Sequence, residues 1–388
     1  FEPSAITKLS TCTSSCRVAV ARGDGSVELV DPEQKLRTLA KIPGLRNREI
    51  DGLAWLRDNT TTTNSNNNKN NAVSKGKESL IGASRDGTIF HLDFNKLSQK
   101  NDFNVGGGAV LDIEEISKRG SSRQLVATAC EDGTIRILEY TPEESVSIFV
   151  QVSSLTTGGS VLSIAWNETR QMLVAGVSDG TIRTFHCKNF EKQIWTPKIR
   201  ITVENYGKRT PTRVWALLAL DDGTIVSGDS LGHVQFWDGD VGTLFKSCEQ
   251  NPNHADVLAL CVDGKQKTIF ASGLDSRIVC IRKQGGRWIS TTAHRPHTHD
   301  VKALCVYTKR KVVVKAKNDE ESQNRESGGR NEKVFAGKEF LVSGGTDTKL
   351  CTFVIESFKD TRPKKHFPWP SVSPICLAKE GRIMTMMR

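Results

Sequence analysis

The stretch DDGTIVSGDSLGHVQFWDGDVGTL, residues 221–244, contains two short apolar runs on either side of a glycine-containing turn. In its second run, HVQFW, apolar and polar residues alternate, which is the period of a β-strand with one buried face. That run ends in Trp237-Asp238. The stretch therefore predicts an antiparallel β-hairpin, and it raises the question of whether the pattern recurs.

The pattern recurs, as a small residue, a polar residue, Asp, Gly and then alternating apolar positions. Its seven copies are ARGDGSVELVD (21–31), ASRDGTIFHLD (83–93), ACEDGTIRILE (129–139), GVSDGTIRTFH (176–186), GDSLGHVQFWD (228–238), GLDSRIVCIRK (273–283) and GGTDTKLCTFV (344–354). Asp-Gly between two such runs predicts a tight hairpin turn with positive φ at both central residues. The turn aspartates are Asp24, Asp86, Asp132, Asp179, Asp275 and Asp347, with Leu231 in that place in the fifth copy.

Two long polar tracts interrupt an otherwise regular spacing. Residues 59–77 are rich in Asn and Thr, and residues 315–333 are nearly all polar or charged, so both are predicted to be disordered loops. Without them the copies lie about 46 residues apart, close to the roughly 40–45 residues of a four-stranded propeller blade. The sequence therefore contains a modular array with one supersecondary unit per copy.

Each hairpin also has an apolar strand upstream, such as VWALLAL (214–220), so a copy supplies a small sheet. A lone four-stranded sheet exposes its faces and edges, whereas radial stacking into a ring buries the faces. Residues 1–370 are therefore predicted to form an all-β, seven-bladed propeller. We expect strands such as QMLVAGV (171–177) to line its channel. Their small apolar side chains argue against a metal-dependent hydrolase site on the axis.

Composition narrows the class of protein. The net charge is +10, which suits a nucleic-acid-rich or acidic environment but also a merely soluble surface. Most of the ten cysteines sit in apolar runs and no CxxC pair occurs, which favours free thiols in a reducing, intracellular location. No apolar run reaches the roughly 18–20 residues of a membrane span, so no membrane partner is expected. The chain begins at Phe1 rather than Met, which indicates a piece of a longer protein.

Two common cofactor and catalytic motifs are missing from the sequence. Neither the GxxxxGK[ST] phosphate loop nor the GxSxG nucleophile elbow occurs. HRPHTHD (294–300) holds three histidines and an aspartate, but no cysteine accompanies them, and we expect no metal there. The sequence therefore predicts a protein that is not an enzyme, with no cofactor and no small-molecule substrate.

The repeat resembles a degenerate WD40 repeat. In that family a turn Asp, a Ser or Thr on the second strand, a His before the first strand and a Trp on the third strand form a hydrogen-bonded tetrad. Only the fifth copy carries the Trp, at Trp237, whereas the seventh keeps His297, Ser343 and Asp347. Structural roles rather than catalysis are expected for these residues and for the turn aspartates.

The order of features from 213 to 247, together with HTHDV (297–301) and SGGTDT (343–348), resembles the cirhin family. These are tandem-propeller WD40 proteins of the t-UTP, or UtpA, subcomplex of the small-subunit processome. The resemblance implies a scaffold on nascent pre-rRNA in 18S rRNA maturation. It also implies a nucleolar location in the nucleus, with other UtpA WD40 and helical subunits and snoRNP components as partners. The alternative is a WD40 adaptor of another assembly, such as a ubiquitin ligase or a chromatin complex.

The C-terminal residues 371–388 resemble the first strands of a further blade. They would either supply a closing strand of this ring or begin a second propeller, and both alternatives remain open.

Two basic segments, 307–317 and 359–367, could neutralise phosphates without reading a base sequence. A solvated loop is the alternative for each of them. The candidate RNA- or partner-binding residues are Lys309, Arg310, Lys311, Lys315, Lys317, Lys359, Arg362, Lys364 and Lys365.

Overall fold

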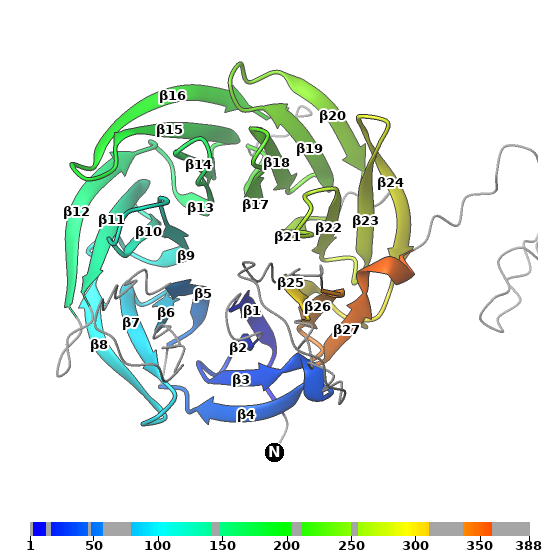
Figure 1. Ribbon diagram of the computed structural model, residues 1–388, viewed down its shortest axis with the longest axis horizontal. Coiled ribbons are helices and arrows are strands. Elements are labelled where there is room, and N and C mark those ends of the chain that lie inside the picture. The colour runs from blue at the N-terminus through cyan, green and yellow to red at the C-terminus, as the bar shows by residue number, and fades with distance from the viewer. Residues whose placement is uncertain are drawn as a thin grey trace, which may run out of the picture.

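The computed structural model describes residues 3–12, 17–45, 48–56, 79–141, 148–203, 211–249, 255–309 and 337–358. In these ranges the chain forms seven antiparallel sheets and two short 3₁₀ helices, η1 (Pro32–Gln34) and η2 (Ile355–Ser357). The sheets follow one another around a central channel and close into a ring (Figure 1). The prediction of an all-β, seven-bladed propeller is confirmed.

We number the sheets as blades 1 to 7 in chain order, and within each blade neighbouring strands follow the sequence. Blades 1 to 4 are β1 (Ile6–Thr11), β2 (Val18–Arg22), β3 (Val27–Asp31) and β4 (Arg37–Ile42); β5 (Ile50–Leu56), β6 (Ser79–Ser84), β7 (Thr88–Asp93) and β8 (Ser98–Asn104); β9 (Val110–Ile116), β10 (Leu125–Cys130), β11 (Thr134–Thr141) and β12 (Ile148–Thr156); and β13 (Val161–Asn167), β14 (Met172–Val177), β15 (Thr181–Asn189) and β16 (Ile194–Thr202). Blades 5 to 7 are β17 (Val214–Ala219), β18 (Thr224–Asp229), β19 (His233–Asp238) and β20 (Leu244–Glu249); β21 (Val257–Val262), β22 (Thr268–Gly273), β23 (Ile278–Gln284) and β24 (Arg287–His294); and β25 (Val301–Thr308), β26 (Glu339–Gly345) and β27 (Leu350–Val354).

The ring closes where blade 1 packs against blade 7. Ile6 and Val20 of blade 1 share one buried cluster with Tyr307 and Val342 of blade 7. The two blades approach so closely that a Cβ atom on Gly344 would lie 2.5 Å from Cγ2 of Ile6. Face-to-face packing of this kind removes the exposed faces of both sheets from water, and it repeats around the ring.

The strand that faces the channel is the first of each blade, because these first strands contact one another around the axis. The prediction that QMLVAGV (171–177) lines the channel is therefore wrong. Residues 172–177 of this segment form β14, the second strand of blade 4, and all six residues of the strand are buried. Neighbouring blades cover both of its faces, so the strand is apolar throughout instead of alternating. A continuous apolar run marks a strand buried on both sides.

The hairpin turns also differ from the prediction. In blade 4 the N–H of Gly180 donates to the carbonyl of Val177 at 3.3 Å, and Gly180 has φ of 79°. Asp179 itself lacks a positive φ. The turn is therefore a three-residue loop, a type I turn followed by one left-handed residue, and not the two-residue type with positive φ at both positions. In blades 6 and 7, Ser276 (φ 57°) and Thr348 (φ 67°) take the left-handed position.

Several predictions fall outside the described residues. These are the disordered loops at 59–77 and 315–333 and the role of residues 371–388. Within the described residues, blade 7 has three strands. No helix in the described part of the chain is long and apolar enough to cross a membrane.

Candidate functional site

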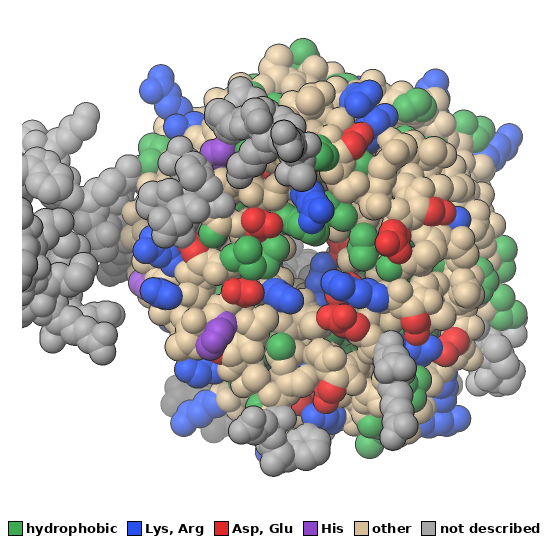
Figure 2. Space-filling view, turned by 180° about the vertical axis from the view of Figure 1, so that it is seen from behind, with side chains coloured by type: hydrophobic (Ala, Val, Ile, Leu, Met, Phe, Trp, Pro, Cys, Tyr) green, Lys and Arg blue, Asp and Glu red, His purple; other side chains and the backbone are tan. Residues whose placement is uncertain are grey.

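The turns between the second and third strands, together with the starts of the first strands, lie on one side of the ring. We call this side the turn face. Backbone hydrogen bonds join the two features, such as the N–H of Ser230 donating to the carbonyl of Arg213 at 2.9 Å. A space-filling view of one face of the ring shows a hollow at its centre, bordered by hydrophobic, basic and acidic side chains (Figure 2). The predicted site residues on the turn face fall into two groups, the turn carboxylates and the tetrad positions.

The turn carboxylates hold their own hairpins. In blade 3, Oδ1 of Asp132 accepts hydrogen bonds from the N–H of Thr134 at 2.9 Å and from its hydroxyl at 2.6 Å. Burial alone would raise the pKa of Asp132, but these hydrogen bonds and the nearby Arg136 hold it below its ordinary value. Asp24, Asp86 and Asp179 accept the same pair of bonds from Ser26, Thr88 and Thr181. In blade 6, Asp275 accepts one bond from the N–H of Arg277 at 3.2 Å.

Arginines supply a second partner for these carboxylates. Arg136 donates to Asp132 at 2.8 Å, and Arg48 donates to Asp86 at 3.0 Å. Arg48 also makes a two-pronged contact with Asp102, at 3.0 and 2.7 Å, and its side chain is only 9% exposed. Sequence reasoning missed Arg48, although it lies two residues before β5, close to where the tetrad histidine is expected.

Blade 7 brings His297, Ser343 and Asp347 together. Nδ1 of His297 lies 2.9 Å from Oδ1 of Asp347, and Nε2 lies 2.8 Å from Oγ of Ser343. This order of groups is that of a serine–histidine–aspartate triad, but the His297 and Asp347 side chains are 0% and 3% exposed, and Ser343 is also fully buried. A hydroxyl with no solvent exposure does not present a nucleophile to a substrate. The arrangement therefore ties the loop before β25 to β26 and to the β26–β27 turn.

Burial alone would raise the pKa of Asp347. Hydrogen bonds from His297 and from the N–H of Thr298, which lies 3.1 Å from Oδ2, outweigh burial and hold the pKa below its ordinary value.

Blade 5 keeps a different part of the tetrad. The indole N–H of Trp237 donates to Oγ of Ser227 at 2.9 Å, and both residues are buried. Leu231 stands in the turn position, and Asp229 replaces the missing carboxylate by accepting from the N–H groups of Leu231 and His233 at 2.9 and 3.0 Å. Burial raises the pKa of Asp229. Sequence reasoning missed Asp229 because it looked for Asp only at the position of Leu231.

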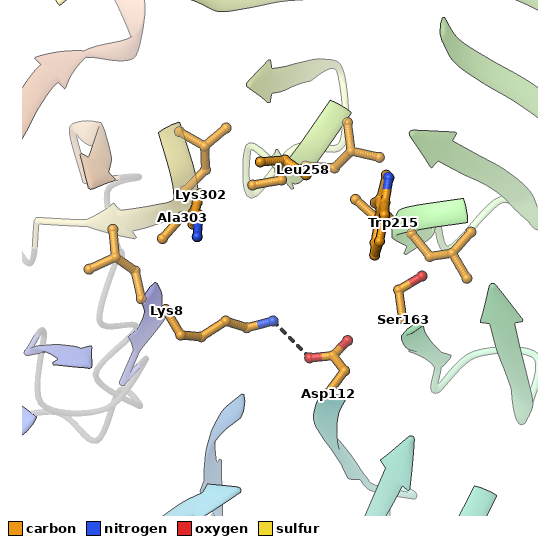
Figure 3. A pocket seen from close by; sticks show the side chains of 13 residues that line it. Lys8, Asp112, Ser163, Trp215, Leu258, Lys302 and Ala303 are labelled. Carbon is orange, nitrogen blue, oxygen red and sulfur yellow. Dashed lines mark hydrogen bonds and ion pairs between the residues drawn. The ribbon is translucent and has the colours of Figure 1, made fainter. Parts of the chain in front are cut away.

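The channel is crossed by an ion pair that the sequence did not predict. Nζ of Lys8 in blade 1 lies 2.7 Å from Oδ1 of Asp112 in blade 3 (Figure 3). Oδ2 of Asp112 accepts a hydrogen bond from the N–H of Ile164 in blade 4 at 3.1 Å. Burial alone would lower the pKa of Lys8, but the charge of Asp112 and its hydrogen bond raise it above 10.5. The pair thus joins three blades at the axis.

Two cavities meet at this ion pair, since Lys8 and Asp112 line both. The cavity towards the turn face has a volume of about 120 Å³, and Trp215, Leu258 and Lys302 also line it. The other has a volume of about 390 Å³ and includes Trp166 and Cys305 in its lining. The channel therefore consists of two compartments with a charged partition between them.

Of the nine basic residues predicted to bind RNA or a partner, only Lys309 lies among the described residues. It is exposed, and its Nζ lies 3.9 Å from a carboxylate oxygen of Glu33 in blade 1. The described residues contain no group of three or more His, Cys, Asp or Glu side chains that could hold a metal ion. Arg310, Lys311, Lys315, Lys317, Lys359, Arg362, Lys364 and Lys365 lie outside the described residues.

Comparison with protein families matches residues 149–186 to the model described as "WD domain, G-beta repeat". The matched segment runs from β12 through β15, so it contains the outer strand of blade 3 and the first three strands of blade 4. The fold is a seven-bladed WD40-type β-propeller. The repeat in the sequence is thus offset by one strand from the blade in space.

Curated relatives match over most or all of the chain. U3 small nucleolar RNA-associated protein 4 of Schizosaccharomyces pombe is 25% identical over 100% of this chain and 48% of its own length. The protein of the same name in Saccharomyces cerevisiae is 24% identical over 99% of this chain and 45% of its own length. The human homolog is 26% identical over 78% of this chain and 41% of its own length. The chain therefore spans about half the length of the curated relatives it matches.

Proposed function

We propose that this propeller is a non-catalytic scaffold module of the cirhin type, acting in the small-subunit processome during early ribosome biogenesis. The observation that carries the proposal is the match of essentially the whole chain to two yeast proteins named for U3 small nucleolar RNA. Because the chain spans about half of each relative, the proposed role belongs to the propeller as part of a larger protein. Its proposed location is the nucleolus.

The architecture suits this role. A closed ring of seven sheets holds loops in fixed positions on two faces and a rim, so several partners can bind at the same time. The proposed partners are the other WD40 and helical subunits of the t-UTP/UtpA subcomplex, the snoRNP components and nascent pre-rRNA. The one triad-like arrangement in the described residues, at His297, is buried, which favours binding over catalysis.

Direct RNA contact is proposed for the two basic segments, 307–317 and 359–367. Lys309, directly after β25, is exposed, and among the residues that the structure describes its one ion-pair partner is Glu33, at 3.9 Å. Lys and Arg side chains in such segments displace counterions from phosphates, so the contact would weaken steeply with salt. Ultraviolet crosslinking to RNA, followed by mapping of the crosslinked peptides, should yield peptides from these segments. Crosslinks confined to other parts of the chain would contradict this assignment.

The scaffold itself is tested by affinity purification of the full-length protein from its own cells, followed by mass spectrometry. Processome subunits of the t-UTP/UtpA group should be enriched, and depletion of the protein should reduce 18S rRNA more than 25S or 28S rRNA. The alternative, a WD40 adaptor of another assembly, predicts cullin adaptors or histones in place of processome subunits. That result would overturn the proposal.

A further inference from the structure

The fourth strands of the blades form the outer rim of the ring (Figure 1). Six blades have a fourth strand in the described part of the chain, and each fourth strand pairs only with the third strand of its own blade. The outward edge of such a strand presents unpaired backbone N–H and C=O groups, which can pair with a strand of another chain. The side chains on each fourth strand decide whether this happens.

Five of the six fourth strands carry side chains that oppose the addition of another strand. Lys, other charged residues and Pro have this effect on an edge, because a charge loses hydration there and Pro has no N–H to donate. Each of β4, β8, β16, β20 and β24 contains Lys or Arg, and β16 also contains Pro197. The sixth strand, β12 (IFVQVSSLT), contains no charged residue and no Pro. All six have one register shift, so a bulge does not distinguish them.

The side chains of β12 suit a neighbouring strand. The strand is nine residues long. Ile148 and Val150 are 41% and 51% exposed, and Ser154 and Thr156 at the other end are exposed as well. Side chains with a branched Cβ pair favourably with β-branched or aromatic side chains directly opposite on an adjacent strand. The edge of β12 therefore has a side-chain surface that matches its backbone.

The backbone register shows which groups of β12 point outward. Directly after β12, the N–H of Thr157 donates to the carbonyl of Gly133 at 2.9 Å, and Thr156 lies opposite Thr134. Hydrogen-bonded and non-hydrogen-bonded pairs alternate along an antiparallel ladder. The N–H groups of Thr156 and Ser154 therefore point away from β11, towards the outer edge of blade 3.

The charges on the neighbouring strand β11 are already paired. Arg136 lies 2.8 Å from Asp132, and Glu139 lies 2.7 Å from Arg123. A charged segment, or the phosphates of an RNA, would lose hydration at this edge without gaining a counter-ion. An uncharged partner therefore fits β12 best.

We propose that β12 binds an extended, uncharged segment of a protein partner, which adds a fifth strand to blade 3. The N–H and C=O groups of the partner would pair with the outward edge of β12. Its β-branched or aromatic side chains would pack against Ile148 and Val150. This proposal rests on the proposed scaffold function, and it names one docking site of that scaffold, on the rim of the ring.

The test uses the purified 388-residue chain and fluorescence anisotropy. The reference probe is a fluorescein-labelled octapeptide, Ser-Thr-Val-Thr-Val-Thr-Val-Ser. Two further probes carry N-methyl groups, one on its three Thr nitrogens and the other on its three Val nitrogens. Alternate residues of a strand direct their N–H groups to opposite edges, so each methylated peptide loses the donors of one edge only. A peptide with Lys in place of each Val and a 12-nucleotide oligouridylate complete the set.

Two substitutions alter β12, and each has a matched control on β20. Ser154→Pro removes an outward N–H, which an edge strand tolerates because no ladder hydrogen bond is lost. Val150→Lys places a charge on the edge. The controls are Ser247→Pro and Phe245→Lys, at exposed positions of the fourth strand of blade 5. Urea denaturation of all four variants checks that they remain folded.

We expect the reference peptide to bind the unaltered chain. One methylated peptide should bind at least about 10-fold more weakly, because its bonding edge has lost its donors, and the other should keep its affinity within about 3-fold. The Lys peptide should bind more weakly than the reference. Ser154→Pro and Val150→Lys should each weaken binding by about 10-fold or more, and the two β20 variants should leave it unchanged.

Equal affinity of the two methylated peptides would overturn the proposal, because binding would then not use a strand edge. This comparison uses the unaltered chain, so it does not depend on the folding of any variant. Preference for oligouridylate, equal loss in Ser154→Pro and Ser247→Pro, or no binding of any peptide would also overturn it.

The peptide assay also separates this site from the proposed function. A chain that binds the peptides as expected but fails to purify with processome subunits would contradict the scaffold function. A chain that purifies with those subunits but binds none of the peptides would contradict the docking site alone.

Discussion

Blades 5 and 7 each keep a different part of the same hydrogen-bonded set. In blade 7, His297 joins Ser343 to Asp347, and Phe353 stands where the tryptophan of the set would be. In blade 5, Trp237 donates to Ser227, and Asp229 takes over the turn. Phe353 pairs with Leu341 and Trp237 pairs with Ile225, so the two positions share one register relative to the serines. Each blade therefore keeps its four- or three-stranded sheet with only part of the set, and in both blades the buried serine hydroxyl retains a hydrogen-bond partner.

The largest effect is expected for His297→Ala in blade 7. The substitution leaves the buried Ser343 hydroxyl without its partner and removes one of the hydrogen bonds to the Asp347 carboxylate, which keeps the one from Thr298. This change costs about 2–4 kcal/mol of the free energy of unfolding. Urea denaturation followed by tryptophan fluorescence measures the loss. The control is His299→Ala, an exposed residue two positions away, with an expected change below about 0.5 kcal/mol. Equal effects of the two substitutions would contradict the assigned role of His297.

Trp237→Phe in blade 5 should cost less, about 1–2 kcal/mol, since one donor is lost and one buried hydroxyl is left unpaired. A double-mutant cycle with Ser227→Ala isolates the hydrogen bond from the change in packing. The coupling free energy between the two substitutions should be about 1 kcal/mol, measured by the same denaturation. Strict additivity would show that the indole contributes through packing alone.

The pH dependence of the free energy of unfolding tests the role of Asp347 in blade 7. The pKa of Asp347 is lower in the folded state than its ordinary value of 3.8, so its ionised form stabilises the fold. This contribution is complete above the unfolded pKa of about 3.9 and is lost as the pH falls through the lower, folded pKa. Wild type should therefore lose stability below about pH 4 more steeply than Asp347→Asn, measured by denaturation between pH 6 and 3. Identical pH dependence of stability in the two proteins would contradict the stabilising role assigned to the Asp347 carboxylate.

The smallest effect is expected from restoring the missing residue, with Phe353→Trp in blade 7. Its indole N–H would reach Ser343 as that of Trp237 reaches Ser227, adding about 0.5–1 kcal/mol if the half-buried site accepts the larger ring. Phe353→Leu serves as the control, because it removes the ring without adding a donor. A loss of stability in both variants would show that the two positions are not equivalent.

The sequence predicted the number of blades and the positions of the hairpins because both depend on local signals. Asp-Gly and alternating apolar residues act over about ten residues, and they recur in each copy. The channel-facing strand was misassigned because an apolar run such as 172–177 does not distinguish burial between two sheets from exposure to a channel. The turn type was also wrong, because Asp-Gly fits both hairpin classes.

The missing parts of the site depend on contacts between distant residues. Lys8 and Asp112 are 104 residues apart and meet only because the ring closes. Arg48 reaches Asp102 across 54 residues. Asp229 was overlooked since it lies two residues before the expected position. The pairing of the first and second strands skips one residue in every blade, as between Val214 and Ala216 in blade 5. Such a bulge is a property of strand pairing, which the pattern of apolar and polar residues in the sequence does not contain.

We propose that this propeller belongs to a particle that contains U3 small nucleolar RNA, the RNA that appears in the names of its yeast relatives. The most direct test is gradient sedimentation of a lysate from cells that carry the tagged full-length protein. The tagged protein is then precipitated from each fraction through its tag, and the U3 RNA that precipitates with it is quantified. We expect U3 RNA to be enriched with the protein in fast-sedimenting fractions. Sedimentation of the protein in light fractions without U3 RNA would contradict it.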